Sequence, residues 1–414
     1  MSKKYLNVFL SLIFTLNAPA GFAQGQRWVS PPYNINMNGA APVVTTIPGA
    51  TPGTNNISNG AYGPNGQLEF YVKDLSVYLG SSSQLLGKLP NSVGSAEGSE
   101  VEIVRVPGPG LRFYVIYTTY LTSQGRSLFY VKVDCTHAAL VFSPALNTNL
   151  PSSSSPYFLE CNYFDAQGLA LSKPIFSLVT HSTSRYLFTV GFKGSPKLGA
   201  TPYNYGGLLR WTIDANGIHN QTVIATTTDL NHNYGNYYDF WNYLTVSQMS
   251  LSDDQTRLAW GGGTGPGGGA GQAMLFEVKL NPTNYSYVPG SFRQYFIPYT
   301  HAHRIAGVEY ATGSNKLYVS TRDGLFYVPT YGSTPVFIPG SVNLTQQSLS
   351  SSSGSQLQYV KSMGKIVGVK VTNTAGHNGT LFSIDPANNN IASLLTTPLT
   401  SWNGEGLTLP DLPK

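Results

Sequence analysis

Aromatic and amide side chains are densest between residues 229 and 244, whose sequence is DLNHNYGNYYDFWNYL. Aromatic rings offer flat apolar faces on which sugar rings can stack, while amides and carboxylates hydrogen-bond to hydroxyl groups. Aromatic side chains that cluster on a surface commonly mark a binding site. The residues predicted to bind a ligand are Tyr234, Tyr237, Tyr238, Asp239 and Trp241. The alternative is that these side chains pack between structural elements as core or loop anchors.

Two histidines stand in the segment THAHR, at His301 and His303. On an extended strand they would point to the same side, and two imidazoles can share a metal ion. Zinc requires at least a third ligand, and no other histidine has a recognisable ligand spacing. We therefore predict no metal and no cofactor, and expect these histidines to be hydrogen-bonded or exposed to solvent.

Other segments that could carry chemistry have simpler explanations. The run GGGTGPGGGAGQ (261–272) lacks the Lys-Ser/Thr of a phosphate-binding loop and precedes an expected strand, so it predicts a loop between strands. Asp253 and Asp254 are adjacent at an expected turn, where cooperating carboxylates would not be correctly spaced. The segment DANG (214–217) predicts a hairpin turn. The sequence therefore identifies no catalytic residue.

Cys135 and Cys161 are the two cysteines of the chain. In an exported protein an even pair can form a disulfide, and both lie near the ends of expected strands. A bridge between neighbouring strands is one interpretation, and two buried free thiols are the other.

The N-terminal residues have the arrangement of a secretory signal peptide. MSKK supplies positive charge, YLNVFLSLIFTL is a short apolar run, and small residues lead to Ala23. The run is shorter than the ~20 residues that span a bilayer, and no later segment is long and apolar enough. We expect residues 1–23 to be removed and residues 24–414 to be exported to the periplasm, the cell surface or the medium.

Charge argues against nucleic acid as a partner. The formal net charge is +5, and removal of Lys3 and Lys4 with the leader leaves 22 basic and 19 acidic residues. Because the remaining basic residues form no cluster or stripe, the sequence does not predict nucleic-acid binding.

The composition favours an all-β fold. Only 10% of residues are charged, and the 44 glycines and 27 prolines interrupt helices. The 27 tyrosines, together with threonine and valine, are typical of half-buried strands.

A recurring hairpin predicts the architecture. GPNGQLEFYVKDLSVY (63–78) and GSNKLYVSTRDGLFYV (313–328) alternate apolar and polar residues and share the same turn chemistry. Six such units lie between about residues 60 and 390, and the chain ends could supply a further one. Small sheets that repeat radially form a β-propeller. We predict one propeller of seven four-stranded blades, with six or eight blades and a pair of sandwiches as alternatives.

Several segments resemble one family of propellers. Trp28 lies near the expected mature start, and the first unit then contains Asn65-Gly66, LEFY (68–71) and Val77-Tyr78. EIVRVPGPGLRFYVIYT with LFYVKVD, and GLTLPDL near the C-terminus, complete the similarity. Together they are similar to secreted, WD40-like propellers associated with gliding motility and type IX secretion. The sorting domain that usually follows such propellers is not within these 414 residues. The resemblance implies the fold and a role at the cell surface, such as adhesion, and it transfers no catalytic residue.

We therefore expect a secreted propeller that binds or scaffolds, with a surface glycan or a cell-surface protein as its partner. The alternative is an enzyme on the same fold, either a polysaccharide lyase or hydrolase or a metal-assisted hydrolase.

Overall fold

The computed structural model describes residues 26–53, 58–89, 101–108, 110–121, 125–135, 141–142, 177–180, 185–193, 205–226, 228–230, 248–263, 273–297, 305–321, 323–345, 356–373, 378–396 and 398–400. The fold and its contacts are those of these residues.

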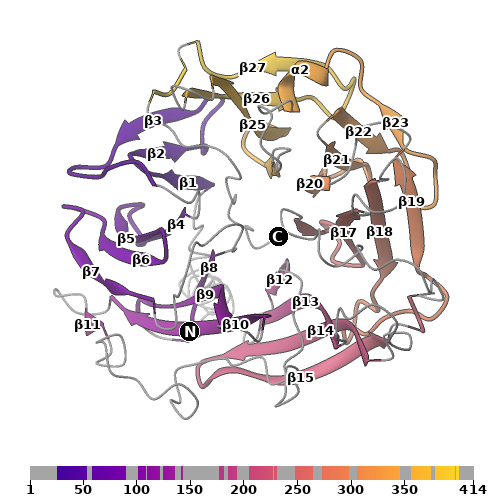
Figure 1. The fold of residues 1–414 in the computed structure, drawn as a ribbon, viewed down its shortest axis with the longest axis horizontal. Helices are drawn as coiled ribbons and strands as arrows, with labels where there is room; N and C mark the ends of the chain where they lie inside the picture. The colour runs from indigo at the N-terminus through magenta and orange to yellow at the C-terminus, as the bar shows by residue number, and fades with distance from the viewer. Residues whose placement is uncertain are drawn as a thin grey trace, which may run out of the picture.

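Seven small antiparallel sheets surround a common axis and form a seven-bladed β-propeller (Figure 1). Six sheets have four strands and one has three. The first strand of each sheet lies nearest the axis, and the last lies at the outer rim. The predicted all-β propeller of seven blades is confirmed, and within the described residues the first blade has three strands.

The blades follow the chain in order. Blades one and two consist of β1 (Arg27–Ser30), β2 (Tyr33–Asn36) and β3 (Val43–Thr46), then β4 (Ser58–Tyr62), β5 (Leu68–Lys73), β6 (Ser76–Leu79) and β7 (Leu85–Lys88). Blades three and four consist of β8 (Val101–Arg105), β9 (Arg112–Leu121), β10 (Gly125–Asp134) and β11 (Val141–Phe142), then β12 (Ser177–Thr180), β13 (Arg185–Lys193), β14 (Tyr205–Asp214) and β15 (Gly217–Thr226).

The remaining three blades repeat the four-stranded pattern. Blade five consists of β16 (Met249–Leu251), β17 (Arg257–Gly263), β18 (Ala273–Lys279) and β19 (Arg293–Ile297). Blades six and seven consist of β20 (Ile305–Tyr310), β21 (Leu317–Thr321), β22 (Gly324–Val328) and β23 (Val336–Phe337), then β24 (Leu357–Val360), β25 (Lys365–Asn373), β26 (Asn378–Ile384) and β27 (Ile391–Ser393). The short helix α2 (Val342–Thr345) lies between blades six and seven. Among the described helices, none has the length and apolar character required to cross a membrane.

The recurring hairpin forms the two middle strands of its blade. In blade two, β5 and β6 pair across a two-residue turn in which Asp74 and Leu75 have φ values of 50° and 57°. Positive φ at both positions gives the turn a twist that matches the strands it joins. Alternate side chains of β5 then face opposite neighbours: Phe70 packs toward blade three, and Tyr71 packs toward blade one. Alternation along the strand therefore places buried side chains on both faces of the blade.

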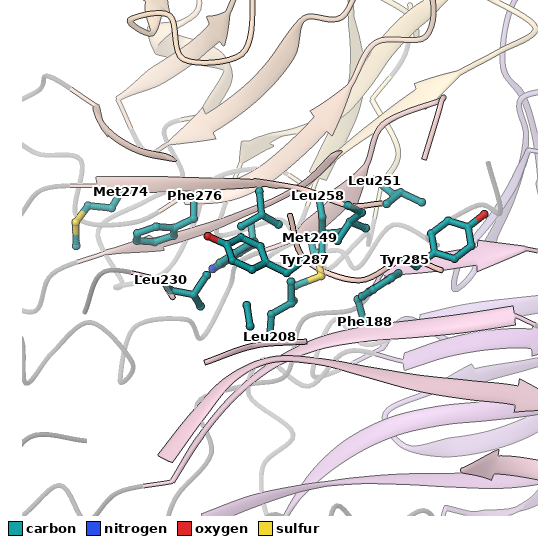
Figure 2. Packing of buried hydrophobic residues seen from close by; sticks show 14 residues of the cluster. Phe188, Leu208, Leu230, Met249, Leu251, Leu258, Met274, Phe276, Tyr285 and Tyr287 are labelled. Atoms are coloured by element: carbon teal, nitrogen blue, oxygen red, sulfur yellow. The ribbon is translucent and has the colours of Figure 1, made fainter. Parts of the chain in front are cut away.

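The core consists of separate layers between neighbouring blades. Figure 2 shows the layer between blades four and five, where Phe188 and Leu208 of blade four contact Met249, Leu258 and Phe276 of blade five. Because each sheet buries both faces, no single blade could retain its core without its neighbours.

The ring closes where blade one packs against blade seven. Trp28 and Ile35 of blade one share an apolar cluster with Val360, Val367 and Leu381 of blade seven. The Gln26 side chain also donates to the carbonyl of Tyr359 at 2.8 Å, and the Tyr33 hydroxyl donates to the carbonyl of Thr400 at 2.9 Å. The expected contribution of residues 404–414 to this closure lies outside the described residues, as does the predicted leader.

Candidate functional site

The aromatic residues that the sequence singled out, Tyr234 to Trp241, lie outside the described residues, so their binding role stays a prediction. The start of their segment is described. Asp229 accepts hydrogen bonds from the N–H and the hydroxyl of Thr226 at 2.8 and 2.7 Å. The Tyr287 hydroxyl donates to the carbonyl of Asp229, and Leu230 is buried in the layer of Figure 2. The segment therefore begins at a fixed position beside blades four and five.

The disulfide between Cys135 and Cys161 stays a prediction, because only Cys135 is among the described residues. Cys135 follows β10 and is buried, and burial is the main cause that raises the pKa of its thiol above the usual value. Cys161, His301 and His303 lie outside the described residues. In the described part of the chain, no three His, Cys, Asp or Glu side chains are grouped closely enough to hold a metal ion.

The acidic turn residues have the structural roles that the sequence indicates. Asp254 Oδ1 accepts from the Ser252 hydroxyl at 2.5 Å and from the Thr256 N–H at 3.1 Å, and thereby stabilises the turn between β16 and β17. Oδ1 of Asp214 accepts from the Asn216 N–H at 2.7 Å within the turn between β14 and β15. These carboxylates are therefore turn-forming groups.

A cluster of ionisable side chains that the sequence analysis missed lies between blades five and six. Alternation on β18 turns Ala273, Leu275 and Glu277 toward blade six, whereas Phe276 and Val278 face blade four. Glu277 therefore lies beside Tyr295 of β19 and Tyr310 of β20. The available signal was Glu277 itself, an acidic residue within the otherwise apolar strand AMLFEV (273–278).

Both oxygens of Glu277 accept hydrogen bonds. The Tyr295 hydroxyl donates to Oε2 at 2.5 Å, the Tyr310 hydroxyl donates to Oε1 at 2.7 Å, and Nη1 of Arg257 lies 3.6 Å from Oε1. Glu277 is 1% exposed, and this burial raises its pKa despite the opposing effect of the two tyrosines and Arg257. Burial also raises the pKa of each tyrosine, and the adjacent carboxylate adds to that effect.

The cluster continues to the surface. The Tyr295 hydroxyl accepts a hydrogen bond from the N–H of Gly332 at 2.8 Å, which brings the connection between β22 and β23 onto blade five. Beside Gly332, the ring of half-buried Tyr331 lies under two exposed cations: Nζ of Lys279 is 4.5 Å from the ring centroid and Cζ of Arg293 is 5.3 Å from it. We call Arg257, Glu277, Lys279, Arg293, Tyr295, Tyr310 and Tyr331 the blade-five/six seam.

Polar side chains on the innermost strands connect blades to one another. The Asn59 amide donates to the carbonyl of Val101 at 2.9 Å, joining blades two and three. The Ser250 hydroxyl donates to Glu309 Oε2 at 2.8 Å, and Glu309 Oε1 accepts from the N–H of Tyr359 at 3.1 Å. Ser250, Glu309 and Tyr359 thereby link blades five, six and seven.

The polar groups described above are of two kinds: buried carboxylates that join blades, and cations that lie at the surface. Glu277 and Glu309 are each 1% exposed and hydrogen-bonded between blades, so in this arrangement they stabilise the ring and do not reach a ligand. Lys279, Arg293 and Tyr331 end the same seam at the surface, where a cation pair with an aromatic ring can bind an anionic group.

No protein-family model and no curated protein matches the chain. Solved structures with similar folds include a Trypanosoma rangeli sialidase, at 10% identity and a TM-score of 0.41 over 82% of this chain and 51% of that one. An α-L-arabinofuranosidase from Clostridium thermocellum matches at 13% identity and a TM-score of 0.37, over 72% of this chain and 95% of that one. A puromycin hydrolase matches at 9% identity and a TM-score of 0.37, over 91% of this chain and 54% of that one. The chain thus spans about half the length of the sialidase and of the puromycin hydrolase.

Proposed function

We propose that this propeller is a binding or scaffold protein whose ligand is a surface glycan or a partner protein. The observation that carries the proposal is the engagement of the interior carboxylates. Glu277 and Glu309, which could have served acid–base chemistry, are almost fully buried and accept hydrogen bonds from the neighbouring blade. In the described ring these carboxylates therefore join neighbouring blades, and recognition falls to the surface and the connections.

Two features support a glycan as the ligand class. The segment that contains Tyr234, Tyr237, Tyr238, Asp239 and Trp241 combines stacking rings with hydrogen-bonding groups, and Leu230 fixes its start in the core. The protein as a whole is rich in hydroxyl and amide groups and only 10% charged, which suits the recognition of uncharged hydroxyls.

A second candidate function is hydrolysis of a bound glycan. The observation that favours it is the raised pKa of Glu277, because a general acid must hold its proton near the working pH. The adjacent Arg257 and tyrosines could stabilise charge if the seam opened to a substrate. Hydrolysis would require that Glu277, now 1% exposed, come into contact with solvent.

We further propose that the protein is exported through residues 1–23 and acts outside the cytoplasm, at the cell surface or in the periplasm, as its resemblance to gliding-associated propellers implies. Fractionation of the producing cell, with the N-terminus determined by mass spectrometry, tests this. A protein that starts at Gln24 in the periplasmic, surface or medium fraction supports export, and an uncleaved cytoplasmic protein refutes it.

The function is tested with purified residues 24–414 on a panel of polysaccharides, with binding and product release measured in the same samples. Trp241→Ala removes the largest ring of the predicted site, and Trp28→Phe serves as a control for a change to a tryptophan that is buried between blades one and seven. Saturable binding without product, weakened about tenfold or more by Trp241→Ala alone, supports the proposal. New reducing ends or unsaturated sugars that disappear in Glu277→Gln would establish the enzyme instead. The absence of binding and of product across the panel would refute a glycan as the ligand. A partner protein captured by cross-linking would then support the other proposed ligand class.

A further inference from the structure

The surface end of the blade-five/six seam is formed by two segments that contain no carboxylate. No Asp or Glu occurs from Val278 to Val308, nor from Gly324 to Ile384. Within these segments lie the connection between β18 and β19 and the connection between β22 and β23, which meet at Tyr331. Along the chain, the carboxylate nearest to the positive charges gathered there is therefore that of Glu277, two residues before Lys279.

Lys279 and Arg293 are held near one another by the same ring. Because their charged groups lie 4.5 and 5.3 Å from the centroid of Tyr331, the two charges are separated by about 10 Å at most. In the described part of the chain, neither cation has a carboxylate within ion-pair distance. Glu277, which Lys279 influences electrostatically, is buried and already engaged by Tyr295, Tyr310 and Arg257. Two like charges at this separation repel, and an anion placed between them would relieve that repulsion.

Hydrogen bonds hold the Arg293 side chain and the backbone of Lys279 in place, and the Lys279 ammonium lies over the Tyr331 ring. Arg293 donates to the carbonyls of Gly290 at 3.2 Å and Phe292 at 2.8 Å, and both hydrogen bonds use the same nitrogen, Nη1. These two bonds therefore do not use its other two side-chain nitrogens. The Tyr331 hydroxyl donates to the carbonyl of Ser291, and the Ser291 hydroxyl accepts from the N–H of Lys279 at 3.0 Å. The connection that carries Arg293 is thereby tied both to Tyr331 and to the end of β18. A preorganised cation pair loses less conformational entropy on binding.

We propose that Lys279, Arg293 and Tyr331 form a subsite for the carboxylate or sulfate group of an acidic polysaccharide. The two cations bind the anionic substituent, and the neighbouring hydroxyl and amide side chains bind the uncharged part of the sugar. The same two connections supply these groups, which are Asn281, Thr283, Asn284, Thr330, Ser333 and Thr334. A sugar offers several hydroxyl groups beside its anionic substituent and so matches these side chains, and an acidic peptide is an alternative outcome of the test. The inference rests on the proposed glycan-binding function and assigns it a second site, separate from the predicted aromatic segment.

The test compares anionic and neutral probes on one set of variants. Wild-type residues 24–414, Lys279→Gln/Arg293→Gln and the control Lys316→Gln are titrated with polygalacturonate, a sulfated dextran, unmodified dextran and poly-L-glutamate. Lys316 is the matched control because its Nζ also lies over a tyrosine ring, 5.4 Å from the centroid of Tyr327, but donates to the carbonyl of Pro386 in blade seven. Unfolding curves confirm that each variant is folded.

The expected result is that the double variant binds the acidic polysaccharides about tenfold or more weakly, as the loss of charge-assisted hydrogen bonds implies, while Lys316→Gln matches the wild type. Added salt should weaken the binding of the wild type much more than that of the double variant. Preference between the carboxylated and the sulfated polymer identifies the anionic group.

Three other results would overturn the inference. Equal binding of polygalacturonate and sulfated dextran by the wild type and the double variant would show that the anion binds elsewhere, while the proposed function would stand. Poly-L-glutamate binding as tight as that of the polysaccharides, and lost in the double variant, would make the pair a site for acidic peptides. Failure of the wild type to bind any polysaccharide would refute the inference together with the glycan function.

Discussion

The side-chain amide of Gln248 pairs with the backbone of Leu357 as a neighbouring strand would. Its Oε1 accepts the N–H of Leu357 at 3.0 Å, and its Nε2 donates to the carbonyl of the same residue at 2.7 Å. Oε1 also accepts from the N–H of Val308 at 3.2 Å. One buried side chain at the start of β16 therefore joins blades five, six and seven, although Gln248 and Leu357 are 109 residues apart in the chain.

Substitution of Gln248 by alanine should lower the stability of the whole ring. Gln248→Ala leaves the buried N–H and carbonyl of Leu357 without this partner, and each unsatisfied group costs ~1–3 kcal/mol. We expect the free energy of unfolding to fall by about 2–4 kcal/mol in urea titrations. Gln67→Ala is the control, because Gln67 is exposed and makes one surface hydrogen bond, to Glu69 at 2.7 Å. Equal losses in the two variants would contradict the bridging role.

Glu277 should make stability depend on pH in the direction opposite to most acidic residues. Because burial raises its pKa in the folded protein, the unfolded chain loses this proton first as pH rises. The stability that Glu277 contributes is thus fully present below the usual carboxyl value of 4.5 and is lost as pH rises through its raised pKa. Glu277→Gln should therefore show a flatter dependence of unfolding free energy on pH above 4.5. A variant that retains the slope of the wild type would contradict this assignment.

The contribution of Asp214 to stability should depend on pH in the direction opposite to that of Glu277. Burial alone would raise its pKa, but hydrogen bonds from the Asn216 N–H and from His219, with the charge of His219, outweigh burial and lower it. Nε2 of His219 lies 2.9 Å from Oδ2 of Asp214. The contribution of Asp214 is therefore present above the usual value of 3.8 and is lost as pH falls through its lowered pKa. Acid unfolding of Asp214→Asn should be less steep than that of the wild type, and an unchanged acid limb would refute the assignment.

Gly217 should not tolerate a side chain. Its φ of 144° is unfavourable for other residues, and a Cβ there would lie 2.8 Å from the Tyr130 hydroxyl of blade three. We expect Gly217→Ala to lower the free energy of unfolding by about 1–3 kcal/mol. Gly313→Ala is the control, because Gly313 has a φ of 76° with nothing within 4 Å of the added atom. Gly217→Ala should cost more than Gly313→Ala, and the reverse order would show that Tyr130 yields to the added atom.

Cys135 should resist alkylation in the folded protein. It is 9% exposed, and burial raises the pKa of its thiol, so little reactive thiolate reaches solvent. Peptide mass spectrometry after iodoacetamide treatment should find Cys135 unmodified under native conditions. In denaturant without reductant, labelling of both cysteines would show that they are free, and protection of both until reduction would establish the predicted bridge to Cys161. Rapid native labelling of Cys135 would contradict its burial.

The sequence by itself determined the class of fold and the units from which it is built. Segments such as LEFYVKDLSVY specify a hairpin because apolar and polar residues alternate on both sides of a break at Lys73-Asp74. The turn itself lies one residue later, at Asp74 and Leu75. The same alternation, repeated at regular intervals, is sufficient to predict a ring of small sheets. Turn roles of Asp214 and Asp254 followed from local chemistry alone, because their hydrogen-bond partners lie within a few residues.

Only the tertiary structure decided which polar side chains meet. Glu277, Tyr295, Tyr310 and Tyr331 are spread over two blades, and no local spacing indicates that their side chains converge. Gln248 gave no signal either, because its partner Leu357 is set by the order of the blades around the ring. Local periodicity shows which face of a strand is buried, but the identity of the neighbour across that face depends on ring closure. The seam between blades five and six, and the cation pair at its surface, exist only once the ring has formed.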